Sequence, residues 1–364
     1  MNPLQEIFVA IIAGYLAMTN FLAHQIIDLL PSEPIEEEVE VTEDTTLLSD
    51  LAELPSRIKT IPDILRTSAL YQQATVIGSD GFTEATTDEP IDAIVNVFCT
   101  LTNSEFKRTT TGTGFFIDAD GIIMTNAHVA QFLLLEKSDR YDDAECLIRT
   151  GNPATAQYTA ELLYLSPAWI QENATVLNDA VPLGTGERDY ALLYVSETTS
   201  GEPLPAQFPA LGYDSDLLKT SVKDDLVVAA GYPASDLLRS GPNTALLPKQ
   251  AETSISELYT FGSNYADVFA IRGSAVGAQG ASGGPVVNGN GDVIGMIATR
   301  GDDAVDGTGS LRAITLSHID RTITEETGFS LAENLGGNLA YRSEVFATTL
   351  APFLLTILEF EDPR

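Results

Sequence analysis

The chain has 364 residues, and its 44% hydrophobic content excludes a disordered chain and allows a sizeable core. Its 52 acidic and 19 basic residues give a formal net charge of -33. This charge argues against nucleic acid and anionic lipid surfaces as partners, because phosphates would be repelled. Two cysteines, Cys99 and Cys146, without CxxC spacing argue against a zinc site. Any histidine base must be one of three residues, His24, His128 and His318.

Residues 1–30 are expected to hold a membrane anchor or a signal helix. The stretch IFVAIIAGYLAMTNFLA at 7–23 has no charge, and with 24–27 it approaches the ~20 residues that span a bilayer. A cleaved signal peptide and an apolar helix packed within the fold are the alternatives. The flank that follows is acidic and lacks Lys and Arg until Arg57, so we expect it to lie on the extracytoplasmic side.

Residues 31–60 are predicted to form an acidic linker, because PSEPIEEEVEVTEDTT at 31–46 combines a charge run with two prolines. Residues 61–90 form a helical lead-in. Its helix is expected over 61–77, with Pro62 in the first turn, where a missing amide hydrogen costs nothing.

From residue 91 the pattern changes to short apolar runs separated by turn residues, which is typical of strands. The turn DADG joins the second and third runs as a hairpin. The expected strands are 94–102, 113–118, 122–127, 144–150, 156–166 and 190–196, then 226–233, 250–262, 268–273, 284–288, 292–299 and 311–316. Two groups of about six strands predict a mainly β domain of two barrels over 91–325.

Residues 326–364 form a C-terminal extension. Within it, VFATTLAPFLLTILEF at 345–360 is apolar but contains Pro352 and is short for a membrane span. We expect a helix that packs against the barrels, with a helix lying on a membrane surface as the alternative.

Three residues at predicted strand ends carry the chemistry. His128 lies in TNAHVA, Asp189 in RDYALLYV and Ser282 in GAQGASGGPVV. A serine nucleophile needs a base for its proton, a carboxylate that orients the base, and amides that face the developing oxyanion. A glycine-rich loop leaves room for such amides. A phosphate cradle is disfavoured, because no Walker lysine follows the glycines.

The motifs TGTGFFIDADGIIMTNAHVA, DYALL, AAGYP and GASGGPVV resemble those of the trypsin-like (chymotrypsin-fold) serine proteases, particularly the bacterial DegP/HtrA-type branch. The resemblance covers about residues 90–325. It implies two six-stranded antiparallel barrels with the site in their cleft. It also implies peptide-bond hydrolysis of protein or peptide substrates, with no metal or organic cofactor.

By the same resemblance, His128 is the general base, Asp189 the orienting carboxylate and Ser282 the nucleophile. The amides of Gly280 and Ser282 form the oxyanion hole. A protease fold that only holds peptides is the alternative function. A β-rich structural protein would leave both motifs unexplained.

Two departures from the family pattern limit which properties of the family can be expected of this chain. Ala281 stands where many activated trypsins have an aspartate, so activation by a freed N-terminus is not expected. About 40 residues follow residue 325, too few for the PDZ domain of DegP-type enzymes. The oligomeric state is therefore left open.

The resemblance places the base of the specificity pocket at Val276 and its wall near Ala298, Thr299 and Arg300. Val276 disfavours cleavage after Lys or Arg, which needs a buried acid, and favours a small or medium apolar side chain. An acidic preference involving His318 and Arg300 is the alternative, and a merely packed or surface-exposed His318 is the simpler interpretation.

The resemblance also places Cys99 and Cys146 on the first and fourth strands of the first barrel, which become neighbours when the barrel closes. A disulfide fits this arrangement and an extracytoplasmic location. Two unpaired buried thiols are the alternative.

Overall fold

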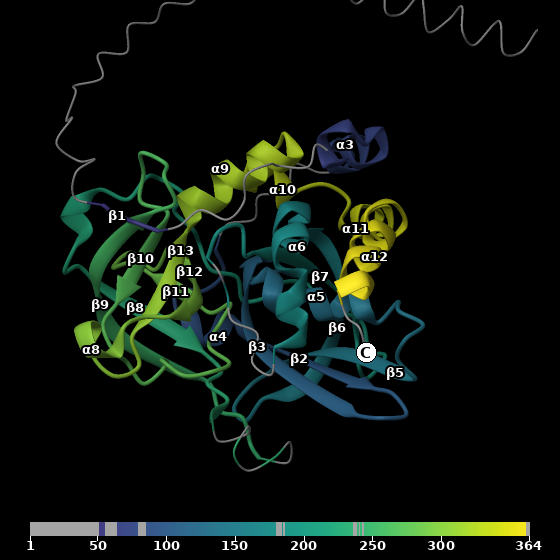
Figure 1. Ribbon diagram of the computed structural model, residues 1–364, viewed down its shortest axis with the longest axis horizontal. Coiled ribbons are helices and arrows are strands. Elements are labelled where there is room, and N and C mark those ends of the chain that lie inside the picture. Colours follow the sequence, from purple (N-terminus) through teal and green to yellow (C-terminus); the bar gives the residue numbers. More distant parts are fainter. Residues whose placement is uncertain are drawn as a thin grey trace, which may run out of the picture. The chain divides into compact units, whose positions relative to one another are not determined.

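The computed structural model describes residues 51–54, 64–78, 85–179, 184, 186–235, 239, 241 and 244–361. Figure 1 shows two barrels of strands with helices around them. The predicted anchor and most of the acidic linker lie outside the described residues. The account below concerns the compact unit within residues 46–364.

The first barrel is a closed antiparallel ring in the order β2-β3-β4-β7-β6-β5. It closes because β2 pairs with β3 on one side and with β5 on the other, so Val97 lies opposite both Gly112 and Ile148. Its strands are β2 (Ile94–Thr102), β3 (Lys107–Asp118), β4 (Ile122–Thr125), β5 (Asp143–Thr150), β6 (Thr155–Leu165) and β7 (Ala191–Thr198).

The second barrel closes in the order β8-β9-β10-β13-β12-β11, with β11 returning to β8. The long β9 closes it, because residues 249–254 pair with β8 and 255–259 pair with β10. A two-residue strand, β1 (Ala52–Glu53), adds to β9 in parallel. The barrel strands are β8 (Leu226–Gly231), β9 (Lys249–Thr260), β10 (Val268–Ile271), β11 (Pro285–Val287), β12 (Val293–Arg300) and β13 (Leu311–Thr315).

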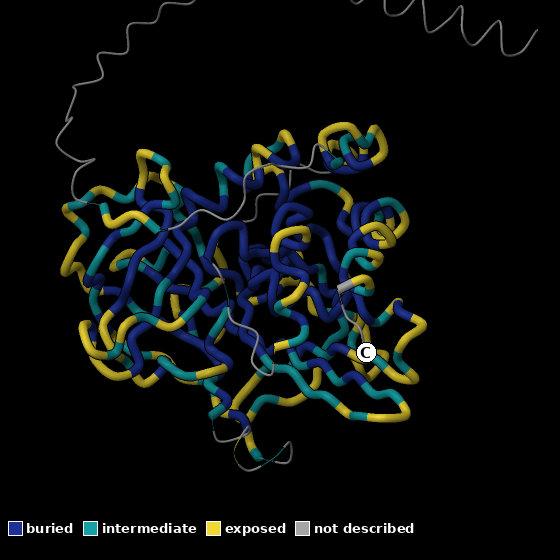
Figure 2. Tube along the Cα trace, in the orientation of Figure 1, coloured by how far each residue is buried: buried dark blue, intermediate teal, exposed yellow. Residues whose placement is uncertain are grey.

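The predicted fold class is therefore confirmed: the protein is mainly β, with two six-stranded antiparallel barrels and helices at the C-terminal end. The strands are mostly buried in both barrels, whereas hairpin ends and outer helix faces are exposed (Figure 2). One prediction needs adjustment. β3 begins at Lys107 rather than 113, because the polar, threonine-rich start of this strand is only partly buried and lacks an apolar signal.

A disulfide joins β2 and β5 within the first barrel. Cys99 and Cys146 lie directly opposite each other in the register, with Cα atoms 4.1 Å apart. Both residues are buried. The bridge therefore reinforces the strand pair that closes this barrel.

Helices fill the connections and follow the second barrel. They are α2 (Ile64–Thr67), α3 (Ala69–Val76), α4 (Pro90–Ala93), α5 (Ala127–Leu135), α6 (Pro167–Asn173), α8 (Asp303–Asp306), α9 (Leu316–Thr327), α10 (Leu331–Asn334), α11 (Leu339–Thr349) and α12 (Ala351–Glu361), with 3-10 turns η1 (Ala174–Asn178) and η2 (Thr220–Val222). The described part of the predicted 61–77 helix is divided into α2 and α3, and Ser68 caps α3.

The C-terminal helices pack on the first barrel side of the molecule. α11 contacts α3, β6 and β7, and α12 contacts α5, α6 and η1 (Figure 1). Phe346 of α11 is buried in the main core together with Leu354 and Leu358 of α12. In the part of the chain that is described, no single helix is long and apolar enough to cross a membrane. The pair α11 and α12, bent by 45°, passes that test by length and composition only.

Candidate active site

His128 and Asp189 form a buried hydrogen-bonded pair in the first barrel. His128 Nδ1 lies 2.8 Å from Asp189 Oδ2, and the two side chains are 4% and 0% exposed. The His128 amide donates to the other carboxylate oxygen at 2.9 Å. This amide belongs to the first turn of α5, where unpaired N–H groups and the helix dipole favour a negative charge. The carboxylate thus fixes both the ring and the backbone of the histidine.

Two neighbours restrict Asp189 further. Asn126, the N-cap of α5, donates its side-chain amide to the Asp189 carbonyl at 2.8 Å rather than capping its own helix. Gly184 leaves no room for a side chain, because an added Cβ would lie 2.4 Å from both Asp189 Oδ2 and the Ala298 carbonyl oxygen. The aspartate of the first barrel and Ala298 of β12 in the second therefore meet at this glycine.

The Ser282 loop belongs to the second barrel and approaches Thr113 of β3 in the first. Gly280 has a φ of 96° and Gly283 a φ of 88°, in the left-handed region that favours glycine. A Cβ at Gly283 would lie 1.9 Å from the Thr113 carbonyl oxygen of β3. Glycine is thus required for both the turn and the close approach of the two barrels.

Two amides of this loop are left without an acceptor. The amides of Ala281, Gly283 and Gly284 donate to backbone carbonyls. Within the described part of the chain, the N–H groups of Gly280 and Ser282 have no such bond. An oxyanion hole needs unpaired N–H donors, and these two donors alternate along one tight loop.

The Ser282 hydroxyl points to a carbonyl in this structure. Its Oγ lies 3.4 Å from the Ala298 oxygen. Between the two described residues Ser282 and His128 there is no hydrogen bond. His128 and Asp189 are hydrogen-bonded to each other, whereas the Ser282 side chain is not directed at His128.

Thr113 is a residue that the sequence motifs did not single out. Its amide donates to the Ser282 carbonyl at 2.8 Å, and its hydroxyl donates to the Gly280 carbonyl at 2.7 Å. The same hydroxyl accepts from the Tyr232 amide at 2.9 Å. One buried residue of the first barrel thereby holds the loop of the second, at Gly280 through its side chain and at Ser282 through its backbone amide.

The residues predicted for the specificity pocket differ in burial and in the partners they contact. Val276 is fully buried in the core of the second barrel, and Thr299 is partly exposed on β12. Arg300 points to solvent and pairs with Asp303 at 2.7 Å. His318 lies in α9 and has different partners. The contacts therefore give no support to an acidic specificity shared by Arg300 and His318.

His318 forms a second His–Asp pair. Its Nδ1 lies 3.0 Å from Asp267 Oδ1, and Arg321 donates to the same oxygen at 2.5 Å. Burial acts to raise the pKa of Asp267, but hydrogen bonds from His318, Ser263 and the Phe261 amide hold this pKa well below its usual range. This cluster attaches α9 to the loop before β10.

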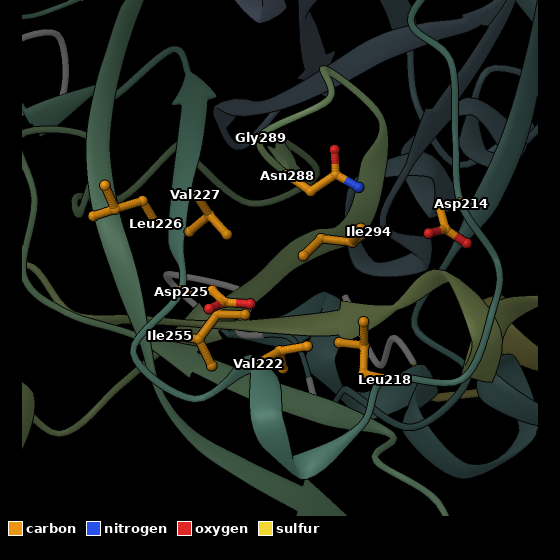
Figure 3. A pocket seen from close by; sticks show the side chains of 10 residues that line it. All are labelled: Asp214, Leu218, Val222, Asp225, Leu226, Val227, Ile255, Asn288, Gly289 and Ile294. Carbon is orange, nitrogen blue, oxygen red and sulfur yellow. The ribbon is translucent and has the colours of Figure 1, made fainter.

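A separate pocket of about 360 Å³ lies at the other end of β8 and β11 from Ser282. Figure 3 shows its apolar side chains with two carboxylates and an amide among them. It is lined by Asp214, Leu218, Val222, Asp225, Leu226, Val227, Ile255, Asn288, Gly289 and Ile294. The residues of the candidate active site do not contribute to it.

No group of three or more His, Cys, Asp or Glu side chains among the described residues is arranged to hold a metal ion. The candidate site thus consists of a His–Asp pair, a serine and two free backbone amides. These groups are suited to acyl transfer.

Comparison with known proteins identifies the family. Two solved structures of the protease Rv3671c are similar to this chain, each with a TM-score of 0.38. The inactive form is 19% identical, with 65% of this chain and 90% of that chain covered. The active form, from M. tuberculosis, is 18% identical, with 79% and 99% covered. No curated protein matches the chain. The model of the trypsin-like peptidase domain matches residues 112–296, half of the chain, so this protein belongs to the trypsin-like peptidase family.

Proposed function

We propose that the protein is a serine endopeptidase that hydrolyses peptide bonds through an acyl-enzyme. Ser282 is the nucleophile, His128 the general base and then acid, and Asp189 the carboxylate that orients His128. The observation that carries this proposal is the buried His128–Asp189 bond of 2.8 Å beside a serine loop with free amides at Gly280 and Ser282.

In the first step, Ser282 Oγ attacks the carbonyl carbon of the substrate as His128 Nε2 takes the hydroxyl proton. The Gly280 and Ser282 amides stabilise the negative oxygen of the tetrahedral intermediate. His128 then gives the proton to the leaving amine, and the C–N bond breaks. Water repeats the sequence on the acyl-enzyme and releases the acid with Ser282 restored.

The serine must turn before it reacts. Its 3.4 Å contact with the Ala298 carbonyl is long for a hydroxyl donor, so its exchange for a bond to His128 costs little. Rotation about the Cα–Cβ bond between staggered positions provides that exchange without a backbone change.

For the substrate, we propose a small or medium apolar side chain before the cleaved bond, with Val276 at the pocket base. The buried, uncharged Val276 supports this preference over a basic one. Cleavage of a peptide library checks it, and a dominant cut after Lys, Arg or Glu would refute it.

We also propose that the protease domain lies outside the cytoplasm, tethered by an N-terminal membrane helix. The uncharged stretch at 7–23 and the Cys99–Cys146 disulfide support this, since disulfides persist in oxidising compartments. External protease added to intact cells should remove the domain. Protection of the domain would reverse the topology.

A fluorophosphonate probe tests the function directly, because it reacts only with an activated serine. Wild-type protein should be labelled, Ser282→Ala should not, and His128→Ala should be labelled far more slowly. The competing function is a protease fold that binds peptides without cleaving them. Well-folded wild-type protein that resists the probe would favour that alternative and exclude ours.

A further inference from the structure

The segment that carries Asp189 is held on its other side by α9, through an arginine that directly precedes the aspartate. Arg188 is 7% exposed and has a φ of 57°, in the left-handed region that a non-glycine residue rarely adopts. Such a conformation persists only where the surroundings hold it. The contacts of its side chain supply that constraint.

The Arg188 guanidinium reaches three groups of α9. It donates to the Glu325 carboxylate at 2.7 Å, to the Thr322 carbonyl at 3.2 Å and to Glu326 at 3.4 Å. Glu325 is half exposed, whereas Glu326 is completely buried. The guanidinium holds five N–H donors in a fixed plane, so one arginine can bind acceptors that lie farther apart than those a compact lysine ammonium reaches.

Glu326 is itself anchored in the first barrel. It accepts from the Tyr164 hydroxyl at 2.6 Å and from the Ser166 hydroxyl at 2.8 Å. The next residue after Asp189 is fixed by the same helix, because the Tyr190 hydroxyl lies 2.8 Å from the Thr322 hydroxyl. Both neighbours of Asp189 are therefore bound to α9.

We propose that Arg188 and Glu326 are positioning residues for the active site: their contact fixes the backbone at 188–190 so that Asp189 holds His128 in the reactive orientation. This inference rests on the proposed function of the triad. Neither side chain touches His128 or Ser282. A small misplacement of a catalytic group can reduce the rate by about 100-fold, so the loss of this anchor affects turnover more than substrate binding.

Arg188→Asn is the first test variant. Asparagine tolerates the left-handed conformation but lacks the guanidinium, so it separates the contacts from the backbone requirement. The substrate is an intact peptide that the library assay identifies as one the wild-type protein cleaves. We expect kcat to fall by about 10- to 100-fold with KM nearly unchanged. Fluorophosphonate labelling should slow by a similar factor. Arg188→Lys keeps the positive charge, so its kcat and labelling rate should lie between those of wild-type protein and Arg188→Asn.

A second readout does not need turnover. The low-field proton resonance of His128 Nδ1–H, identified by its loss in His128→Gln, should shift or broaden in Arg188→Asn. Arg342→Gln is the matched control, because Arg342 is also a buried arginine but binds the Asn334 and Gly336 carbonyls instead. If Arg188→Asn does not fold, the same measurements are made on Glu326→Gln, in which the side chain keeps its shape and loses its charge.

The outcomes separate the two proposals. A failure of the probe to label wild-type protein would refute the proposed serine peptidase function. The proton resonance of His128 would still test whether Arg188 positions Asp189. Labelled wild-type protein with the same rate and resonance in folded Arg188→Asn would overturn the positioning role. An equal loss in Arg342→Gln would also overturn it, because the effect would then be general destabilisation.

Discussion

The molecule has two buried His–Asp pairs with nearly the same contact. His128 and Asp189 lie 2.8 Å apart, and His318 and Asp267 lie 3.0 Å apart. Their surroundings differ. The two carboxylate oxygens of Asp189 accept from the ring and the amide of one histidine, whereas Asp267 also accepts from an arginine, a serine, a threonine and a backbone amide.

The outer ring nitrogens differ as well. Nε2 of His318 is buried and, among the described residues, has no hydrogen-bond partner. Nε2 of His128 is not a buried atom of this kind. A His–Asp contact does not by itself indicate catalysis, because a histidine that acts as a base also needs an accessible second nitrogen. The second pair has the features of a structural anchor.

The largest expected effect comes from removing one carboxylate charge at the first pair. Asp189→Asn should lower kcat by about 10⁴-fold, since an amide stabilises the wrong tautomer of His128. Cleavage of a library peptide measures this loss. The matched variant Asp267→Asn should lower kcat far less, because Asp267 has no contact with His128 or Ser282 and reaches the Asp189 segment through α9. Equal losses in both variants would remove the distinction between the pairs.

The next effect concerns stability at the second pair. Asp267→Asn should lower the free energy of unfolding in urea by about 2–4 kcal/mol, because Arg321 and His318 lose a buried charged acceptor. The lowered pKa of Asp267 means that its contribution is present above the ordinary aspartate pKa and is lost as pH falls through the folded value. The difference between wild-type and variant should therefore shrink below about pH 4. A constant difference across about pH 3–6 would contradict this interpretation.

The smallest of the three effects tests the space around the first pair. Gly184→Ala should reduce kcat by about 100-fold, because the new methyl group must displace Asp189 or the Ala298 carbonyl. Gly289→Ala is the control, since a Cβ at Gly289 meets no atom within 4 Å. Unchanged turnover in Gly184→Ala would show that the crowding at Asp189 and the Ala298 carbonyl has no effect on catalysis.

Much of the fold could be predicted from the sequence, because alternating apolar runs and turn residues act locally. The strand over 94–102 and the DADG hairpin are examples, with residues 94–102 forming β2 as expected. The histidine, aspartate and serine motifs were equally local. Their joint use as a triad remains a proposal.

Other parts depend on contacts between distant segments and leave no local signal. The sequence indicates only that Thr113 lies in a strand, and the folded chain brings its hydroxyl to Gly280. Arg188 has no local signal of its partners, because 138 residues separate it from Glu326. The sequence allows His318 as a residue of the specificity pocket, because nothing near it in the sequence indicates its contact with Asp267. Such pairings are decided by tertiary packing.

The closure of the two barrels also sets a lower limit on the length of an active fragment. The segment 112–296 that matches the family model excludes β2, β13 and α9. Without β2, the first barrel loses the strand between β3 and β5, and without β13 the second loses the strand between β10 and β12. A fragment trimmed to the recognisable motifs would keep His128, Asp189 and Ser282 on two open sheets with unpaired edges, which tend to aggregate. A truncation that keeps both barrels closed must therefore begin before Ile94 and end after Thr315.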